Sequence, residues 1–227
     1  MPGEIRRLYH GSSVVVERPE YGKGKPYNDY GLGFYCTETR EMAMEWASGR
    51  GRDGFANCYE IDCSGLNVLD LSREYGVLSW LAVLLENRTF DIASPLALEA
   101  RDYLLSAFLP DYREHDCIVG YRADDSYFSF AQDFINGGIS VKQLGRAMRL
   151  GKLGEQFVLK SERAFGRLDF KGYEVVPQGE WYARRMARDR QAREEYLDRE
   201  RFARQRGDIY ITQILDEGMG PDDERLR

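Results

Sequence analysis

Residues 28–49 read NDYGLGFYCTETREMAMEWASG and place a short strand directly before a helix. The turn Gly31-Leu-Gly33 precedes an aromatic run, which predicts a strand at residues 34–37. Thr39 can cap the helix that follows. The apolar residues that share one face of this helix are Met42, Ala43, Trp46 and Ala47. The stretch therefore predicts a glycine turn, a strand and a helix in immediate succession.

The rest of the chain mixes strands and helices without a regular order. Apolar runs flanked by turn residues predict further strands at residues 5–10, 57–62, 116–121 and 156–160. Helical spacing and capping residues predict helices at residues 76–87, 94–109, 125–136 and 140–151. Because no regular strand–helix–strand rhythm and no internal repeat is visible, we expect an α+β fold.

Residues 179–206 form a long stretch that is almost wholly charged. It carries 9 Arg against 6 Asp+Glu, a local net charge of +3 on an acidic chain. Opposite charges recur four residues apart, so we expect a long charged surface helix that Gly207 ends. The tail, residues 217–227, is polar enough to be loose. We therefore expect a body, residues 1–178, followed by a charged helix and tail, residues 179–227.

The composition excludes several classes of protein. The 227 residues include 32 Lys+Arg and 38 Asp+Glu, and the net charge of −6 argues against a surface built to neutralise nucleic-acid phosphates. With two histidines and four scattered cysteines, we expect neither a metal site nor disulfides. No signal-peptide core is present, and the longest apolar run, Trp80 to Leu85, is too short to cross a membrane. We therefore expect a soluble, cytoplasmic protein with no membrane partner.

General catalytic motifs are absent from the chain. It has no phosphate-binding glycine loop, no zinc-protease motif and no serine-hydrolase elbow. A nucleophile pair of His115 and Cys117 is conceivable, because residues two apart on a strand share a face. No partner that would orient this pair is evident, so we interpret both as ordinary strand residues.

A small set of polar and aromatic residues stands beside glycines at predicted strand ends. The set comprises His10 with Gly11 and Ser12, then Tyr35, and finally Gln156. A glycine after a strand lets the backbone approach a ligand closely. Strand alternation lets Gln156 point into a cleft, whereas Glu155 points away. Each residue alone is more often structural, but together they form a candidate site.

The order of these motifs resembles the ADP-ribosyltransferase superfamily, in its diphtheria-toxin-like branch with a His-Tyr-acidic-or-amide triad. Within it, the chain is most similar to the bacterial domain-of-unknown-function family DUF3990. The stretches that carry the resemblance are Leu8–Ser12, Asp29–Thr37 with the following helix, Asp116–Tyr127 and Gln156–Ser161. They cover the body up to about Phe170.

The resemblance implies a fold, a co-substrate and partners. The fold would be two small antiparallel sheets that form a split core, with NAD in the cleft between them and helices around it. The activity would be mono-ADP-ribosyl transfer from NAD to a macromolecular acceptor, protein or nucleic acid. By analogy, the protein would be a bacterial toxin or phage-defence effector, with a small helical neutralising partner docked on residues 179–206.

The resemblance also implies a role for each candidate residue. His10 would hydrogen-bond a hydroxyl of the adenosine ribose, and Gly11, beside Ser12, would present its backbone to the nicotinamide carboxamide. Tyr35 would stack on the nicotinamide ring, which is cationic in NAD. Gln156 would hold the 2′-OH of the nicotinamide ribose.

One residue departs from the pattern of the resemblance. Many active members carry glutamate where this chain has Gln156, and an amide can neither act as a general base nor stabilise an oxocarbenium ion as an anion. Asp124, Asp125 and Glu155 are therefore accessory candidates. Two alternatives stay open: an NAD glycohydrolase that uses water as the acceptor, and a catalytically silent NAD-binding or interaction module.

Overall fold

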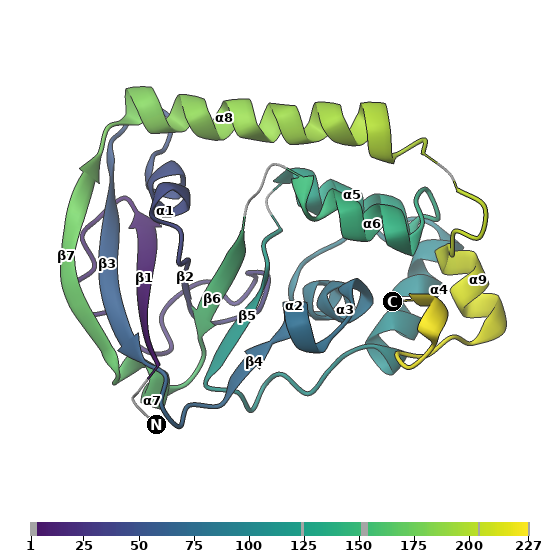
Figure 1. Cartoon of the computed structure of the whole chain (residues 1–227), viewed down its shortest axis with the longest axis horizontal. Coiled ribbons are helices and arrows are strands. Elements are labelled where there is room, and N and C mark those ends of the chain that lie inside the picture. Colours follow the sequence, from purple (N-terminus) through teal and green to yellow (C-terminus); the bar gives the residue numbers. More distant parts are fainter. Residues whose placement is uncertain (1–3, 124, 151–153, 204, 227) are drawn as a thin grey trace.

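The computed structural model describes residues 4–123, 125–150, 154–203 and 205–226 (Figure 1). It shows the predicted α+β fold with two separate sheets, of strand order β1-β3-β7 and β2-β6-β5-β4. The strands are β1 Ile5–Ser12, β2 Phe34–Cys36, β3 Gly54–Asp62, β4 Val68–Asp70, β5 Cys117–Tyr121, β6 Glu155–Leu159 and β7 Leu168–Val176. The helices are α1 Arg40–Ala47, α2 Leu71–Glu74, α3 Val77–Asn87, α4 Pro95–Ala107, α5 Asp125–Ile135, α6 Val141–Ala147, α7 Glu162–Phe165, α8 Gln178–Glu195 and α9 Ile211–Glu217.

The two sheets differ in strand direction. The first sheet is antiparallel throughout, and β6 pairs antiparallel with both β2 and β5 in the second. β4 and β5 run parallel, which corrects the expectation of two wholly antiparallel sheets. A parallel pair needs a long crossover, and α2, α3 and α4 supply it between these two strands.

An isolated backbone bridge joins the two sheets. The Tyr9 N–H donates to Thr37 O at 2.8 Å, and the Thr37 N–H donates to Tyr9 O at 2.9 Å. The bridge lies at the edge of each sheet, on β1 and just after β2. The sheets therefore stay separate layers that meet along one side.

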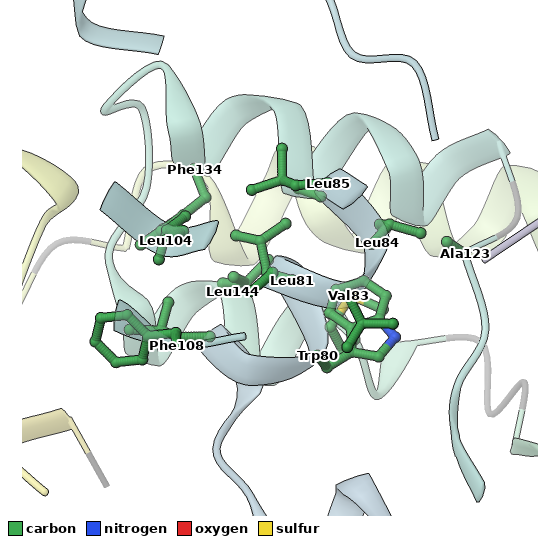
Figure 2. Packing of buried hydrophobic residues seen from close by; sticks show 14 of the residues in the cluster. Trp80, Leu81, Val83, Leu84, Leu85, Leu104, Phe108, Ala123, Phe134 and Leu144 are labelled. Carbon is green, nitrogen blue, oxygen red and sulfur yellow. The ribbon is translucent and has the colours of Figure 1, made fainter. Parts of the chain in front are cut away.

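The main hydrophobic core lies on the helical side of the second sheet. It packs α3 against α4, α5 and α6 and against one face of β5 and β6 (Figure 2). Trp80 of α3 donates its indole N–H to Tyr121 O at 3.1 Å, so the polar atom of this buried ring is satisfied. A second cluster, between the two sheets, joins Leu8 and Ile61 to Phe157 and Leu159.

α8 lies along the top of the molecule in Figure 1 and contacts both α1 and α5. Arg188 of α8 forms a largely buried ion pair with Glu45 of α1, with 2.6 Å between Nη2 and Oε2. At the C-terminal end of α8, Tyr196 stacks on Phe130 of α5 at a ring distance of 4.0 Å and donates to Asp133 at 2.6 Å. The charged helix is therefore packed on the body near its middle and at its C-terminal end.

The predicted helix at residues 179–206 is too long. α8 begins at Gln178 and ends at Glu195, and a π-helical turn follows at Tyr196–Glu200. Surface ion pairs on a helix each contribute only about 0.2–0.5 kcal/mol. We attribute the early end to this weakness, since the regular helix ends directly before Tyr196, which is buried and stacks on Phe130 of α5.

Two further expectations at the chain ends are corrected. β1 continues to Ser12, because His10, Gly11 and Ser12 remain paired with β3, so His10 lies inside the strand and not at its end. The tail is not loose: Met219 is buried and accepts a hydrogen bond from Tyr103 at 3.1 Å. Residues 209–219 also contribute to the main core.

Membrane-spanning helices, disulfides and helix caps were the subject of further expectations, and the described part of the chain bears on each. There, no helix is long and apolar enough to cross a membrane. All four cysteines are free thiols. Ser94 and Ser140 cap α4 and α6 as predicted, whereas Thr39 precedes α1 without a side-chain cap bond.

Gly11 of β1 lies where α1 packs on the first sheet. A Cβ at this position would lie 2.1 Å from Ala43 O and 2.7 Å from Ala47 N, both backbone atoms of α1. Such contacts cannot be relieved by rotating a side chain. The structure therefore gives Gly11 a packing reason to be glycine, independent of any ligand.

We predict that Gly11→Ala lowers the free energy of unfolding by about 1–3 kcal/mol or more, because α1 must move away from β1. Gly145→Ala in α6 is the control, since a Cβ there meets no atom within 4 Å. It should raise stability by about 0.5–1 kcal/mol through helix propensity. Urea unfolding measures both changes, and equal stability of Gly11→Ala and the wild type would contradict the packing.

Candidate active site

A cavity of about 630 Å³ opens where β1, β2 and β6 approach α1 and α8. Its volume is typical of sites for small molecules and cofactors. We call it the central cavity. It is lined by His10, Val16, Arg18, Pro19, Glu20, Lys23, Gly24, Asn28, Asp29, Gly33, Phe34, Tyr35, Trp46, Arg88, Ala123, Gln156 and Arg185. His10, Tyr35 and Gln156, from three different strands, thus border one space.

His10 is held in a single tautomer by its neighbour. Its Nδ1 lies 2.7 Å from Tyr35 O, and because a carbonyl can only accept, Nδ1 must carry the proton. Nε2 of the neutral ring is then a hydrogen-bond acceptor. Burial lowers the pKa of His10 below its ordinary value of 6.5, so the ring is neutral at pH 7. The ring also packs on Phe34 at a centroid distance of 4.4 Å.

Tyr35 uses its hydroxyl to fix the loop that precedes β2. The hydroxyl donates to Gly31 O at 2.5 Å and accepts from the Tyr30 N–H at 3.0 Å. Burial raises the pKa of Tyr35 above its ordinary value of 10.0, so the phenol stays protonated. Lys160 holds the same loop through bonds to Tyr30 O and Leu32 O at 2.5 and 2.6 Å. The aromatic wall of the cavity is therefore pre-organised.

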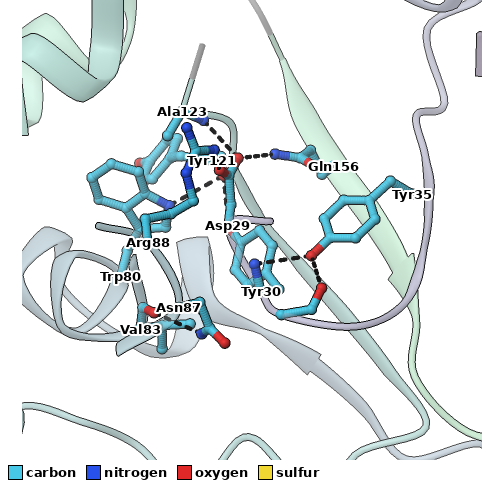
Figure 3. Close-up of polar contacts among 11 residues, drawn as sticks. Asp29, Tyr30, Tyr35, Trp80, Val83, Asn87, Arg88, Tyr121, Ala123 and Gln156 are labelled. Atoms are coloured by element: carbon cyan, nitrogen blue, oxygen red, sulfur yellow. Dashed lines mark hydrogen bonds and ion pairs between the residues drawn. The ribbon is translucent and has the colours of Figure 1, made fainter. Parts of the chain in front are cut away.

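Gln156 of β6 is buried, and its amide is oriented by Asp29 (Figure 3). The Gln156 Nε2 donates to Asp29 Oδ2 at 2.7 Å. Asp29 also accepts from the Ala123 N–H at 3.0 Å and pairs with Arg88, with 2.7 Å between Oδ1 and Nη1. Asp29 is only 6% exposed, so the cavity wall contains a buried carboxylate directly behind the amide.

Asp29 is a site residue that was not predicted from the sequence motifs. It lies just before the Gly31-Leu-Gly33 turn, and apart from this position a single sequence does not distinguish it among 38 acidic residues. Its partners come from the end of α3 and from the residues after β5, so only the fold brings them together. A polar residue next to a glycine turn was the one local feature that pointed to it.

Cationic side chains are concentrated on the cavity wall. Arg18, Lys23, Arg88 and Arg185 all border it, against the carboxylates of Glu20 and Asp29. Lys23 pairs with Glu20 and Arg88 with Asp29. Within the described residues, Arg18 and Arg185 form no ion pair. These two guanidinium groups are free to bind an anion such as a phosphate.

Gly11 and Ser12 do not line the central cavity. Ser12 Oγ accepts a hydrogen bond from Asn57 Nδ2 at 3.1 Å and donates to Val14 O, so it fixes the start of the following loop. The Tyr9 N–H and C=O point to Thr37, and in a strand those of Gly11 point the same way. The Gly11 backbone therefore faces the β2 side, away from β3.

Of the three accessory acidic candidates, Glu155 is the one whose side chain the structure describes. Glu155 is exposed and borders a second cavity of about 330 Å³, which Gln156 also borders. Asp124 lies outside the described residues. Asp125 is the first residue of α5, and its side chain is not described.

The structure gives no support to a thiol mechanism. Burial raises the pKa of the Cys117 thiol to about 12, so it is not a ready nucleophile. In the described part of the chain, no group of three His, Cys, Asp or Glu side chains is placed to hold a metal ion.

The chain belongs to the DUF3990 family, described as a protein family of unknown function, and the family model matches residues 6–170. The predicted membership of DUF3990 and the predicted extent, up to about residue 170, are thereby confirmed, whereas the resemblance to the ADP-ribosyltransferase superfamily stays a prediction. No curated protein and no solved structure matches the chain. The matched region contains β1 to β6 and nearly all of the central cavity, whereas Arg185 on α8 lies beyond it.

The lowered pKa of His10 predicts a pH dependence of stability. Above pH 6.5 the ring is neutral in both the folded and the unfolded state, so it contributes no pH dependence. Below pH 6.5 the unfolded chain binds the proton first, and the free energy of unfolding falls until the folded-state pKa is passed. In His10→Gln, the part of this decrease that is due to protonation of His10 should be absent. Urea unfolding between about pH 7.5 and pH 5 checks it, and parallel curves for variant and wild type would contradict the burial effect.

Proposed function

We propose that the protein is a mono-ADP-ribosyltransferase with an ADP-ribosyltransferase-like core, which uses NAD as co-substrate and modifies a macromolecular acceptor. The observation that supports this most is the convergence of His10, Tyr35 and Gln156 on one cavity. These are the three residues that the resemblance assigns to NAD. They come from β1, β2 and β6, which are far apart in the sequence.

The geometry suits each group of NAD. The His10 Nε2 can accept a hydrogen bond from a hydroxyl of the adenosine ribose. The free guanidinium groups of Arg18 and Arg185 match the diphosphate in charge. The half-buried ring of Tyr35, which lines the central cavity, can stack on the cationic nicotinamide. The Gln156 Oε1 can accept from the 2′-OH of the nicotinamide ribose.

The reaction would break the bond between C1′ of this ribose and the nicotinamide nitrogen. The bonding electron pair leaves with nicotinamide, which becomes neutral, and the ribose passes through an oxocarbenium-like state. The acceptor then bonds to C1′ and loses its proton. Positioning and hydrogen bonds to the 2′-OH lower the barrier, because they strengthen as positive charge develops.

A silent NAD-binding module is the second candidate, and the neutral amide of Gln156 is the observation that favours it. Measuring the release of nicotinamide from NAD distinguishes the transferase from the silent module, because binding alone releases no nicotinamide. Free ADP-ribose without a labelled macromolecule would indicate the glycohydrolase instead.

We predict that the purified protein transfers label from NAD to a component of a cell lysate. His10→Ala and Tyr35→Ala should each reduce the rate of labelling at least about 100-fold, because NAD is no longer held in position. His115→Ala is the matched control, because the second histidine lies outside the central cavity. It should label at the wild-type rate. Undiminished labelling by His10→Ala would exclude the assigned site.

Separate digestion of the labelled product identifies the class of acceptor. Loss of the labelled product on protease treatment would indicate a protein, and loss on nuclease treatment would indicate a nucleic acid. Label that survives both treatments in a macromolecular fraction would contradict both classes.

A further inference from the structure

We infer that Asp29 is a positioning residue that acts through Gln156, so that the Asp29–Gln156 pair supplies together what a single carboxylate would supply at position 156. The inference rests on the proposed function, because it concerns how the same site stabilises positive charge on the ribose. The evidence for this role is the set of hydrogen bonds and the ion pair that Asp29 forms in the structure, and these do not depend on any family resemblance.

Asp29 decides which end of the Gln156 amide faces the ligand. A carboxylate oxygen only accepts hydrogen bonds, so the NH₂ group of Gln156 must face Asp29, as the 2.7 Å contact between Nε2 and Oδ2 shows. The carbonyl oxygen Oε1 is thereby directed away from Asp29. Within the described residues no group donates to this oxygen, and Gln156 borders the central cavity. Oε1 is therefore a fixed acceptor without a protein partner.

The carboxylate also changes the electronic character of the amide. An amide whose N–H donates to an anion is polarised, so that negative charge on its oxygen increases and hydrogen bonds to it become stronger. Asp29 is only 6% exposed, and solvent does not screen it. An oxygen polarised in this way interacts more favourably with an oxocarbenium-like ribose than with the ribose of the ground state, where the positive charge lies on the nicotinamide ring.

Asp29 is itself held rigidly. Arg88 reaches one oxygen and the Ala123 N–H reaches the other, so rotation of the carboxylate would break several bonds. Arg88 is in turn stacked over the ring of Phe128, with its guanidinium carbon 5.3 Å from the ring centroid. A charged group held on several sides transmits its orientation to Gln156 better than a mobile one.

The proposed coupling between Asp29 and Gln156 can be tested by exchanging the carboxylate and the amide between the two positions. Asp29→Asn removes the anion and should lower kcat for nicotinamide release at least about tenfold, while Kd for NAD stays within about threefold. Gln156→Glu should also lose activity, because it sets two carboxylates at hydrogen-bond distance. In the double variant Asp29→Asn/Gln156→Glu, the amide introduced at position 29 would face the carboxylate introduced at position 156. We expect its kcat to exceed that of either single variant at least about tenfold.

Asp116→Asn is the matched control for loss of a buried carboxylate. Asp116 is buried, accepts from the Asn67 N–H at 2.9 Å and pairs with Arg163, but it does not border the central cavity. Its kcat should equal that of the wild type. Thermal unfolding and NAD titration of every variant distinguish loss of fold from loss of turnover.

The outcomes separate the two proposals. A folded wild-type protein that releases no nicotinamide from NAD overturns the proposed function, and the role of Asp29 with it. An active wild type whose Asp29→Asn variant keeps full kcat overturns only the role of Asp29. A double variant that is no more active than the two singles does the same, because a coupled pair must show rescue.

Discussion

The backbone bridge between Tyr9 and Thr37 is the constraint on which the geometry of the central cavity depends. It fixes β1 of one sheet beside β2 of the other, and beyond it the two strands form no further pair in the described structure. The ring of His10 lies next to the bridge and donates to Tyr35 O, so a side chain replaces the backbone ladder at this point. The sheets part from there, and the candidate residues lie along the opening.

The wall of the central cavity around Gln156 is held in place by buried ionic groups. Asp29 connects the loop before β2 to the end of α3, to the residues after β5 and to β6. A buried carboxylate is costly unless it is fully hydrogen-bonded, and here several donors meet that need. Such a group contributes little net stability, but it permits few alternative arrangements of the four segments that it joins. The wall is therefore specified by polar contacts, whereas the core behind it is specified by packing.

Features of the fold that depend only on interactions between neighbouring residues could be predicted from the sequence. The apolar run of α3, the serine caps of α4 and α6, and the alternation that separates Gln156 from Glu155 all depend on neighbours within a few residues. Prediction from the sequence failed where tertiary contacts decide. β7 is a largely exposed edge strand, α8 ends directly before Tyr196 packs on α5, and Asp29 finds partners from distant segments. The parallel β4–β5 pair was missed because β4 has only three residues.

The attachment of α8 determines how a ligand reaches the central cavity. Any wide separation of the two sheets would have to break either the buried Arg188–Glu45 pair near the middle of α8 or the Tyr196–Phe130 stack at its C-terminal end. Residues 17–27 border the cavity from the loop after β1 and are largely exposed, so they can rearrange without unpacking a core. We therefore expect a ligand to enter and leave by a local rearrangement of this segment, without a hinge motion between the two sheets.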